Sequence, residues 1–344
     1  MVSAGSALMV PRRFSTRSFS QHFRRVVVTG LGLVTPLGCG VETVWRRLVA
    51  GDCAVRMLSP DDIRMESFDQ STKMLTYDGL TSKVAAMVPR GSQEGDFDEH
   101  FWLKSKDRKS ISDFIGYALC ASDEALKDAQ WEPTEQNDKD RTGVSIGGGI
   151  GSMSDIFEAA QLLCENKSRR LSPFFVPKTL INMASGHVSM RYGFQGPNHA
   201  AVTACASGAH SVGDATRMIQ FGDADVMVAG GTESTIDALA IAGFCRLRAL
   251  STKYNSFPLE ASRPFDCGRD GFVLVWVKGL EFWYSKNMST QKNEEPKFML
   301  KFLVMECQVM HFTSHNLLLM EEEHFLPCPV QWSRQVSSLI KLII

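Results

Sequence analysis

The chain has 344 residues, of which 44% are hydrophobic, and a formal net charge of -1. A chain of this length can bury a large core, and its near-neutral charge argues against a nucleic-acid or membrane-surface binder. No apolar run reaches the roughly 18 residues that a membrane-spanning helix needs. Nine cysteines occur without a Cys-x-x-Cys pair, which argues against a disulfide framework and a zinc ribbon and suits a reducing compartment.

The N-terminal segment, residues 1–24, is expected to be a mitochondrial transit peptide. The first acidic residue is Glu42, and arginines alternate with serines and threonines before it. A basic, hydroxyl-rich and acid-poor N-terminus is typical of mitochondrial targeting. A disordered basic tail is the alternative. A secretory signal is disfavoured because no continuous apolar segment follows the charges.

From residue 25 onward, apolar runs typical of buried strands alternate with amphipathic stretches typical of helices. Strands are expected at 26–28, 143–146 and 226–229, and helices at 111–126 and 208–221. This alternation predicts an α/β fold.

Two glycine-rich turns, at residues 30–35 and 147–151, invite a dinucleotide-binding interpretation. Neither has the Gly-x-Gly-x-x-Gly spacing that this interpretation needs. NAD binding is therefore disfavoured, and we expect these glycines to permit close packing between elements.

Cys205 is the strongest candidate for a catalytic residue. It follows the apolar run 202–204, which we interpret as a strand end, and its neighbours Ala204, Ala206 and Gly208 are small, as a tight strand-to-helix turn requires. Unpaired N–H groups at the helix start stabilise a thiolate and lower the pKa of such a cysteine below about 8.5. The residues alone leave open the alternative of a buried structural cysteine.

Several segments resemble the beta-ketoacyl-[acyl-carrier-protein] synthases, the condensing enzymes of fatty-acid synthesis. Residues 203–208 resemble the family's turn around its nucleophilic cysteine, and further matching segments follow the family's order. These are 24–32, 35–38, 172–177, 182–187, 222–231, 262–266 and 269–273. The resemblance covers residues 25–273 and implies the N-terminal half of a thiolase-like, layered αβαβα architecture.

The resemblance also implies an activity. Cys205 would take an acyl group from a carrier protein as a thioester, malonyl-carrier protein would be decarboxylated, and the carbanion would attack the thioester. The product is a beta-ketoacyl chain two carbons longer. The backbone N–H of Cys205 would form half of an oxyanion hole. No metal or redox cofactor is implied, and the presequence indicates the mitochondrial matrix.

Two apolar residues and two basic clusters match family positions with further roles. Ile150 and Phe244 correspond to positions that line the acyl pocket, although ordinary core packing is their alternative. Basic residues of the family dock the acidic acyl carrier protein, for which charge complementarity matters more than tight contact. A solvated face is the alternative for the matching residues, which are Lys104, Lys106, Arg108, Lys109, Lys167, Arg169 and Arg170. Family members also pair as homodimers through elements around the strand that follows Cys205.

Residues 274–344 are expected to be a tail that the family lacks, disordered or produced by a shifted reading frame. Over residues 277–288, a frame starting one nucleotide earlier could encode the family's expected continuation, which begins Gly-Glu-Gly-Ala-Gly, if a small insertion shifted the frame near Leu274. The family's two catalytic histidines come from its C-terminal half, and His311, His315 and His324 do not match their contexts. An inactive isoform or a mis-predicted gene model is therefore the alternative to a complete synthase. Histidine, cysteine and glutamate residues that gather in this tail are interpreted as chance, and no metal site is expected.

Overall fold

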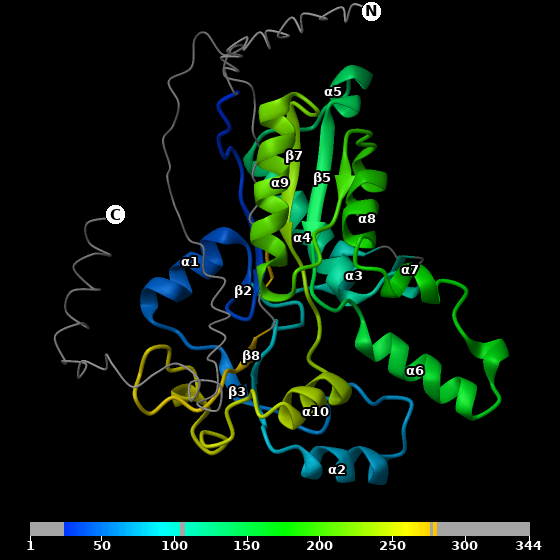
Figure 1. The fold of residues 1–344 in the computed structure, drawn as a ribbon, viewed down its shortest axis with the longest axis vertical. Helices are drawn as coiled ribbons and strands as arrows, with labels where there is room; N and C mark the ends of the chain where they lie inside the picture. The colour runs from blue at the N-terminus through cyan, green and yellow to red at the C-terminus, as the bar shows by residue number, and fades with distance from the viewer. Residues whose placement is uncertain (1–23, 104–106, 276–277, 281–344) are drawn as a thin grey trace, which may run out of the picture.

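The computed structural model describes residues 24–103, 107–275 and 278–280 (Figure 1). The strands are β1 Gly32–Thr35, β2 Gly38–Cys39, β3 Val55–Met57, β4 Val84–Ala86, β5 Thr142–Gly147, β6 Asn198–His199, β7 Val226–Gly231, β8 Leu274–Val275 and β9 Lys278–Leu280. The α-helices are α1 Val41–Ala50, α2 Gln70–Gly79, α3 Glu99–Trp102, α4 Asp113–Asp128, α5 Gln136–Asp140, α6 Met153–Cys164, α7 Phe175–Thr179, α8 Met183–Tyr192, α9 Ser207–Phe221 and α10 Ala238–Arg246. Short 3-10 turns are η1 Asp107–Lys109, η2 Ser168–Arg170, η3 Ala204–Ala206 and η4 Pro258–Glu260.

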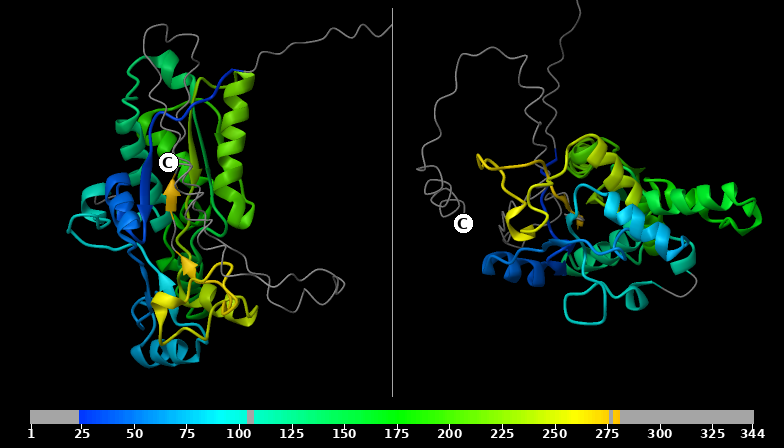
Figure 2. Two further views of the ribbon diagram at one scale, coloured as in Figure 1. Left: turned by 90° about the vertical axis from the view of Figure 1, so that its left-hand side faces the viewer. Right: turned by 90° about the horizontal axis from the view of Figure 1, so that it is seen from below.

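A parallel sheet in the order β6-β5-β7 forms the centre of the fold. The register pairs Thr142 with Val226 and Gly147 with Gly231, so β5 and β7 end side by side. Helix α9 packs on both strands, α8 packs on β5, and α4 packs on α8. Figures 1 and 2 show the sheet between α9 on one face and α4 and α8 on the other. The α/β prediction is confirmed.

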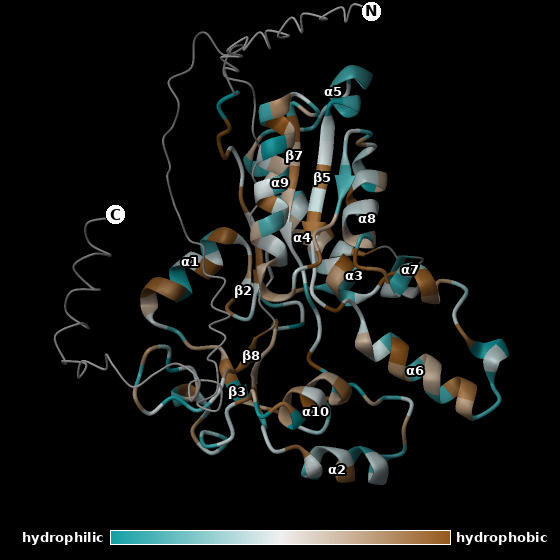
Figure 3. Ribbon diagram, in the orientation of Figure 1, coloured by the Kyte–Doolittle hydropathy of each residue, from teal (hydrophilic) through white to brown (hydrophobic). Residues whose placement is uncertain are grey.

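Helix α4 is buried around most of its circumference. Its buried residues run from Phe114 to Leu126 with few interruptions, because it contacts β1 on one side and α8 on the other. A helix that is apolar on all sides belongs inside a fold rather than on its surface. Figure 3 shows β7 largely in the hydrophobic colour, as expected for a strand covered on both faces.

Two smaller sheets extend the molecule. Strands β2, β1 and β9 form an antiparallel sheet, and β3, β4 and β8 form a mixed one. The first described residues of the expected tail thus form β8 and β9, and β9 pairs with β1. The tail residues 281–344, with His311, His315 and His324, lie outside the described residues.

Two strand predictions are wrong. Residues 26–28 form no strand, and β1 begins only at Gly32. On either side of this segment, Arg24 bonds Asp225, and Leu31 N–H donates to Asp128 at 2.9 Å. Val26 packs against the α9–β7 core cluster.

Residues 202–204 are also not a strand, since β6 ends at His199. The N–H of Thr203 donates to the hydroxyl of Ser207 at 2.9 Å, so it serves the turn before α9 rather than a ladder. In the described part of the chain, no helix is long and apolar enough to cross a membrane.

Candidate functional site

Cys205 lies in the 3-10 turn η3, directly before α9. Ala204 has a φ of 51°, which is left-handed and costly for a residue with a Cβ. The hydroxyl of buried Ser207 holds this turn, 2.7 Å from the carbonyl oxygen of Ala204 and 3.1 Å from that of Gly148. The strained turn directs the chain into α9 immediately after a half-buried cysteine.

The N-terminus of α9 favours negative charge near the cysteine. Ala206 is the N-cap residue, and its methyl group cannot accept a hydrogen bond from the first turn of the helix. The N–H of Ser207, the first in α9, already donates to the carbonyl oxygen of Ala204, so it is the dipole of the helix that favours an anion at this end. This is the environment that stabilises a thiolate.

Glycines let the strand ends approach this turn. A Cβ on Gly147 would lie 2.6 Å from the carbonyl oxygens of Ala201 and Ser207, and a Cβ on Gly231 would lie 2.9 Å from the Cα of Gly208. Both distances are shorter than real Cβ contacts. The prediction that the 147–151 turn serves close packing is confirmed here.

Glu233 is a residue that the sequence did not single out. It follows β7, and its Oε2 accepts hydrogen bonds from the N–H groups of Gly149 and Ile150 at 3.0 and 2.9 Å. Its Oε1 accepts from the N–H of Ser234 at 2.8 Å and from the hydroxyl of Thr235. An acidic residue two positions after a buried strand that ends in Gly-Gly was the available signal.

Ile150 and Phe244 lie on different elements of the fold. Ile150 is 39% exposed on the glycine-rich turn, where Gly149 packs beside Ala204. Phe244 is half-buried on α10 and packs edge-on against Phe272, with 5.5 Å between ring centroids. Helix α10 contacts α6, which follows the turn of Ile150. Their roles as pocket residues remain predictions.

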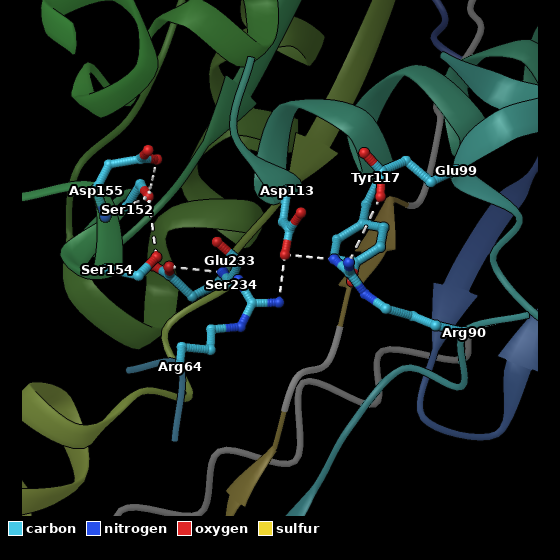
Figure 4. Close-up of polar contacts among 10 residues, drawn as sticks. All are labelled: Arg64, Arg90, Glu99, Asp113, Tyr117, Ser152, Ser154, Asp155, Glu233 and Ser234. Carbon is cyan, nitrogen blue, oxygen red and sulfur yellow. Dashed lines mark hydrogen bonds and ion pairs between the residues drawn. The ribbon is translucent and has the colours of Figure 1, made fainter. Parts of the chain in front are cut away.

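A separate group of charged residues lies in an open groove of about 980 Å³ at the start of α4. Asp113 accepts hydrogen bonds from both Arg64 and Arg90, and Arg90 also donates to the hydroxyl of Tyr117 at 2.9 Å (Figure 4). Burial alone would raise the pKa of Asp113, but the two arginines hold it well below its usual value. The cluster ties α4 to two loops and is not poised for proton transfer.

Comparison with known proteins identifies the domain that carries this site. Residues 23–275 match the family model described as "Beta-ketoacyl synthase, N-terminal domain". The chain belongs to the beta-ketoacyl synthase family. A structure of a beta-ketoacyl synthase from Burkholderia phymatum superposes with a TM-score of 0.60 at 31% identity, over 73% of this chain and 56% of that one.

Curated relatives of this beta-ketoacyl synthase domain carry 3-oxoacyl-[acyl-carrier-protein] synthase names. The mitochondrial protein of Arabidopsis thaliana is 70% identical over 79% of this chain and 58% of its own length. A Rhizobium meliloti synthase is 47% identical over 73% of this chain and 56% of its own length. The chain thus spans a little over half the length of these relatives.

The carrier-docking residues expected from the beta-ketoacyl synthase resemblance are placed only in part. Lys167, Arg169 and Arg170 are exposed at the end of α6, and Lys167 pairs with Glu165. Arg108 lies in η1 beside His100. Lys104 and Lys106, together with the side chain of Lys109, lie outside the described residues.

One related structure bears on carrier docking. It is a type II PKS ketosynthase in complex with its acyl-carrier protein and bound to the hexaketide. It superposes on this chain with a TM-score of 0.57 at 27% identity, over 78% of this chain and 59% of that one.

Proposed function

We propose that Cys205 is the acyl-accepting nucleophile of a 3-oxoacyl-[acyl-carrier-protein] synthase. The observation that carries the proposal is the position of Cys205, between left-handed Ala204 and the uncapped start of α9, in a beta-ketoacyl synthase domain. The Cys205 thiolate attacks the acyl carbonyl carbon and forms a C–S bond. The bond between that carbon and the carrier's sulfur breaks, and the carrier leaves as a thiolate, which takes a proton from solvent.

The whole protein then performs the condensation. Malonyl-carrier protein loses carbon dioxide, and the electron pair of the broken C–C bond becomes a carbanion that attacks the Cys205 thioester. The thiolate leaves, and the chain gains two carbons. The N–H of Cys205 supplies one oxyanion donor for the tetrahedral intermediates. No cofactor or metal takes part.

The partner is an acyl carrier protein in its acyl and malonyl forms. The exposed basic residues Lys167, Arg169 and Arg170 support this, because carrier protein is acidic and steering requires opposite charge. A homodimer forms through the open edge of the central sheet. We place that edge at β7, the strand after Cys205, which is an end strand of the central sheet.

The protein acts in the mitochondrial matrix. Support comes from the acid-free N-terminal sequence and from the Arabidopsis relative, whose name includes "mitochondrial". Import into isolated mitochondria, with loss of the presequence near residue 24, tests this location. An unprocessed chain outside the organelle contradicts it.

Intact-protein mass spectrometry with octanoyl-pantetheine tests the acylation step. We expect one octanoyl group on Cys205 and none in Cys205→Ser. The exposed thiols of Cys53, Cys164 and Cys267 serve as internal comparators, since they share solvent access but no helix start. Octanoyl transfer that favours these thiols over Cys205 contradicts the proposal.

A second function is partner binding without condensation. Leu247 is 71% exposed and Phe265 is 87% exposed, so large apolar side chains are available to a partner at the surface. Steady-state condensation by the purified 344-residue chain, with malonyl-carrier protein supplied, separates the two functions. Turnover excludes the second one.

A further inference from the structure

Glu233 joins the two segments that leave the carboxyl ends of β5 and β7. The N–H of Thr232 donates to the carbonyl oxygen of Gly147 at 2.8 Å, which continues the strand pairing by one step. Beyond it, the Glu233 side chain turns back to the glycine-rich turn and accepts from Gly149 and Ile150. One carboxylate therefore fixes a turn that lies 84 positions earlier in the chain.

The same turn touches the nucleophile segment. A Cβ on Gly149 would lie 3.3 Å from Oε2 of Glu233 and 3.7 Å from the carbonyl oxygen of Ala204. Gly149 is thus packed between the carboxylate and the residue before Cys205. A shift of the glycine-rich turn would change the space directly beside the cysteine.

Glu233 also lies beside the start of the helix that carries Phe244. Ser234 and Thr235 both donate to Oε1, and Asp237 then caps α10 by accepting from Ala240 N–H at 2.9 Å. The segment 232–237 is therefore held at both ends. Through it, the Glu233 carboxylate connects the turn of Ile150 with the helix of Phe244.

Glu233 has no acceptor position left for a reacting proton. A carboxylate offers about four lone-pair sites, and two N–H donors at Oε2, with an N–H and an O–H at Oε1, occupy them. Glu233 is therefore arranged to hold neighbouring segments in place and not to act as a general base.

We infer that Glu233 is a positioning residue for acyl transfer, which holds the Gly149–Ile150 turn against the Cys205 segment and so shapes the entrance for the acyl chain. This inference rests on the proposed acylation of Cys205. Glu233→Gln is the sharpest variant, because an amide has one acceptor oxygen and its NH2 group must face two of the present donors.

The experiment compares two reagents on Cys205 of the full chain. Iodoacetamide is small, so its rate of alkylation depends only on the reactivity and accessibility of the thiol. Octanoyl-pantetheine must also fit beside the glycine-rich turn. We expect Glu233→Gln to slow octanoyl transfer about tenfold, which corresponds to about 1.4 kcal/mol, and to leave alkylation within about twofold. Glu233→Asp, which keeps the charge, should restore part of the transfer rate. Glu94→Gln, at an exposed surface ion pair, is the matched control.

Hydrogen exchange gives a readout that is independent of activity. The amides of Gly149 and Ile150 should exchange about tenfold faster in Glu233→Gln, while those of β5 stay protected. Equal loss of alkylation and acyl transfer, or an unchanged transfer rate, overturns the inference. A wild-type chain that is alkylated at Cys205 but takes no octanoyl group instead refutes the proposed function, and the inference falls with it.

Discussion

The guanidinium of Arg24 donates a 2.6 Å hydrogen bond to the carboxylate of Asp225, 201 positions further along the chain. Arg141, directly before β5, donates to the same carboxylate at 2.9 and 3.0 Å. Asp225, directly before β7, therefore connects Arg24, the first described residue, with the starts of β5 and β7.

Arg24→Ala should lower the free energy of unfolding by about 0.5–1 kcal/mol, since the pair is partly exposed. The hydrogen bond from Arg141, with help from Arg24, lowers the pKa of Asp225 despite some burial. A lowered carboxylate pKa stabilises the fold above the unfolded value of about 3.9 and loses this effect as the pH falls through the folded value. Urea unfolding at pH 7 and pH 3 measures the loss of stability in Arg24→Ala at each pH, with Arg46→Ala as control. An effect as large at pH 3 as at pH 7 contradicts the prediction.

Gly32→Ala should destabilise the domain by about 2–3 kcal/mol. The new Cβ would lie 2.0 Å from the carbonyl oxygen of Ala121 and 2.9 Å from the nitrogen of Ala125, so β1 and α4 must separate. Gly79→Ala is the matched control, because its Cβ would meet nothing within 4 Å at the end of α2. We expect the control to be neutral or stabilising by up to about 1 kcal/mol. Thermal unfolding of both variants measures the two changes in stability. Similar losses of stability in the two variants would mean that the close approach of β1 to α4 is not the cause.

Asp62→Asn should produce a pH-dependent loss of stability. Burial raises the pKa of Asp62, but bidentate hydrogen bonds from Arg56 and one from Ser59 N–H outweigh it and lower the pKa to about 2. We expect a loss of about 1 kcal/mol at pH 6, after allowance for the exposure of Arg56. The difference should disappear as the pH falls from about 4 to about 2. Asp52→Asn is the exposed control, and a difference that stays constant with pH counts against the ion pair.

Much of the fold could be predicted because its core elements are long or strongly apolar. Helices α4 and α9 were expected within two residues of their observed bounds, and β5 and β7 matched likewise. The error at 26–28 has a physical cause. A run of three valines has the same apolar pattern whether or not its backbone belongs to a strand, and here β1 begins only at Gly32.

The sequence predicted only the part of the site that lies within one continuous segment of the chain. The small neighbours of Cys205 made it recognisable in the sequence. The left-handed φ of Ala204 could not be predicted, since glycine or asparagine usually occupies that region. The local sequence offered an acidic residue two positions after β7, but it could not predict the hydrogen bonds of Glu233 to Gly149 and Ile150. These bonds exist only because β5 and β7 end side by side and place two distant loops in contact.

Reversal of the charge at the end of α6 tests the carrier-docking proposal. Arg169 and Arg170 are exposed on η2, so Arg169→Glu with Arg170→Glu should leave the fold intact. It should slow association with an acidic acyl carrier protein about tenfold at low salt, because complementary charge mainly raises the association rate. Stopped-flow fluorescence of labelled carrier protein measures the rate.

The salt dependence provides the decisive control for this variant. Screening shortens the reach of charge to about 3 Å at 1 M salt, so wild type and variant should converge there. Arg46→Glu reverses one charge on α1, which lies on the opposite side of the molecule from α6 (Figure 1), and should alter the rate less than twofold. If Arg46→Glu slows association as much as the η2 variant does, net charge and not a docking surface sets the rate. A difference that persists at 1 M salt would instead indicate that η2 has lost its shape.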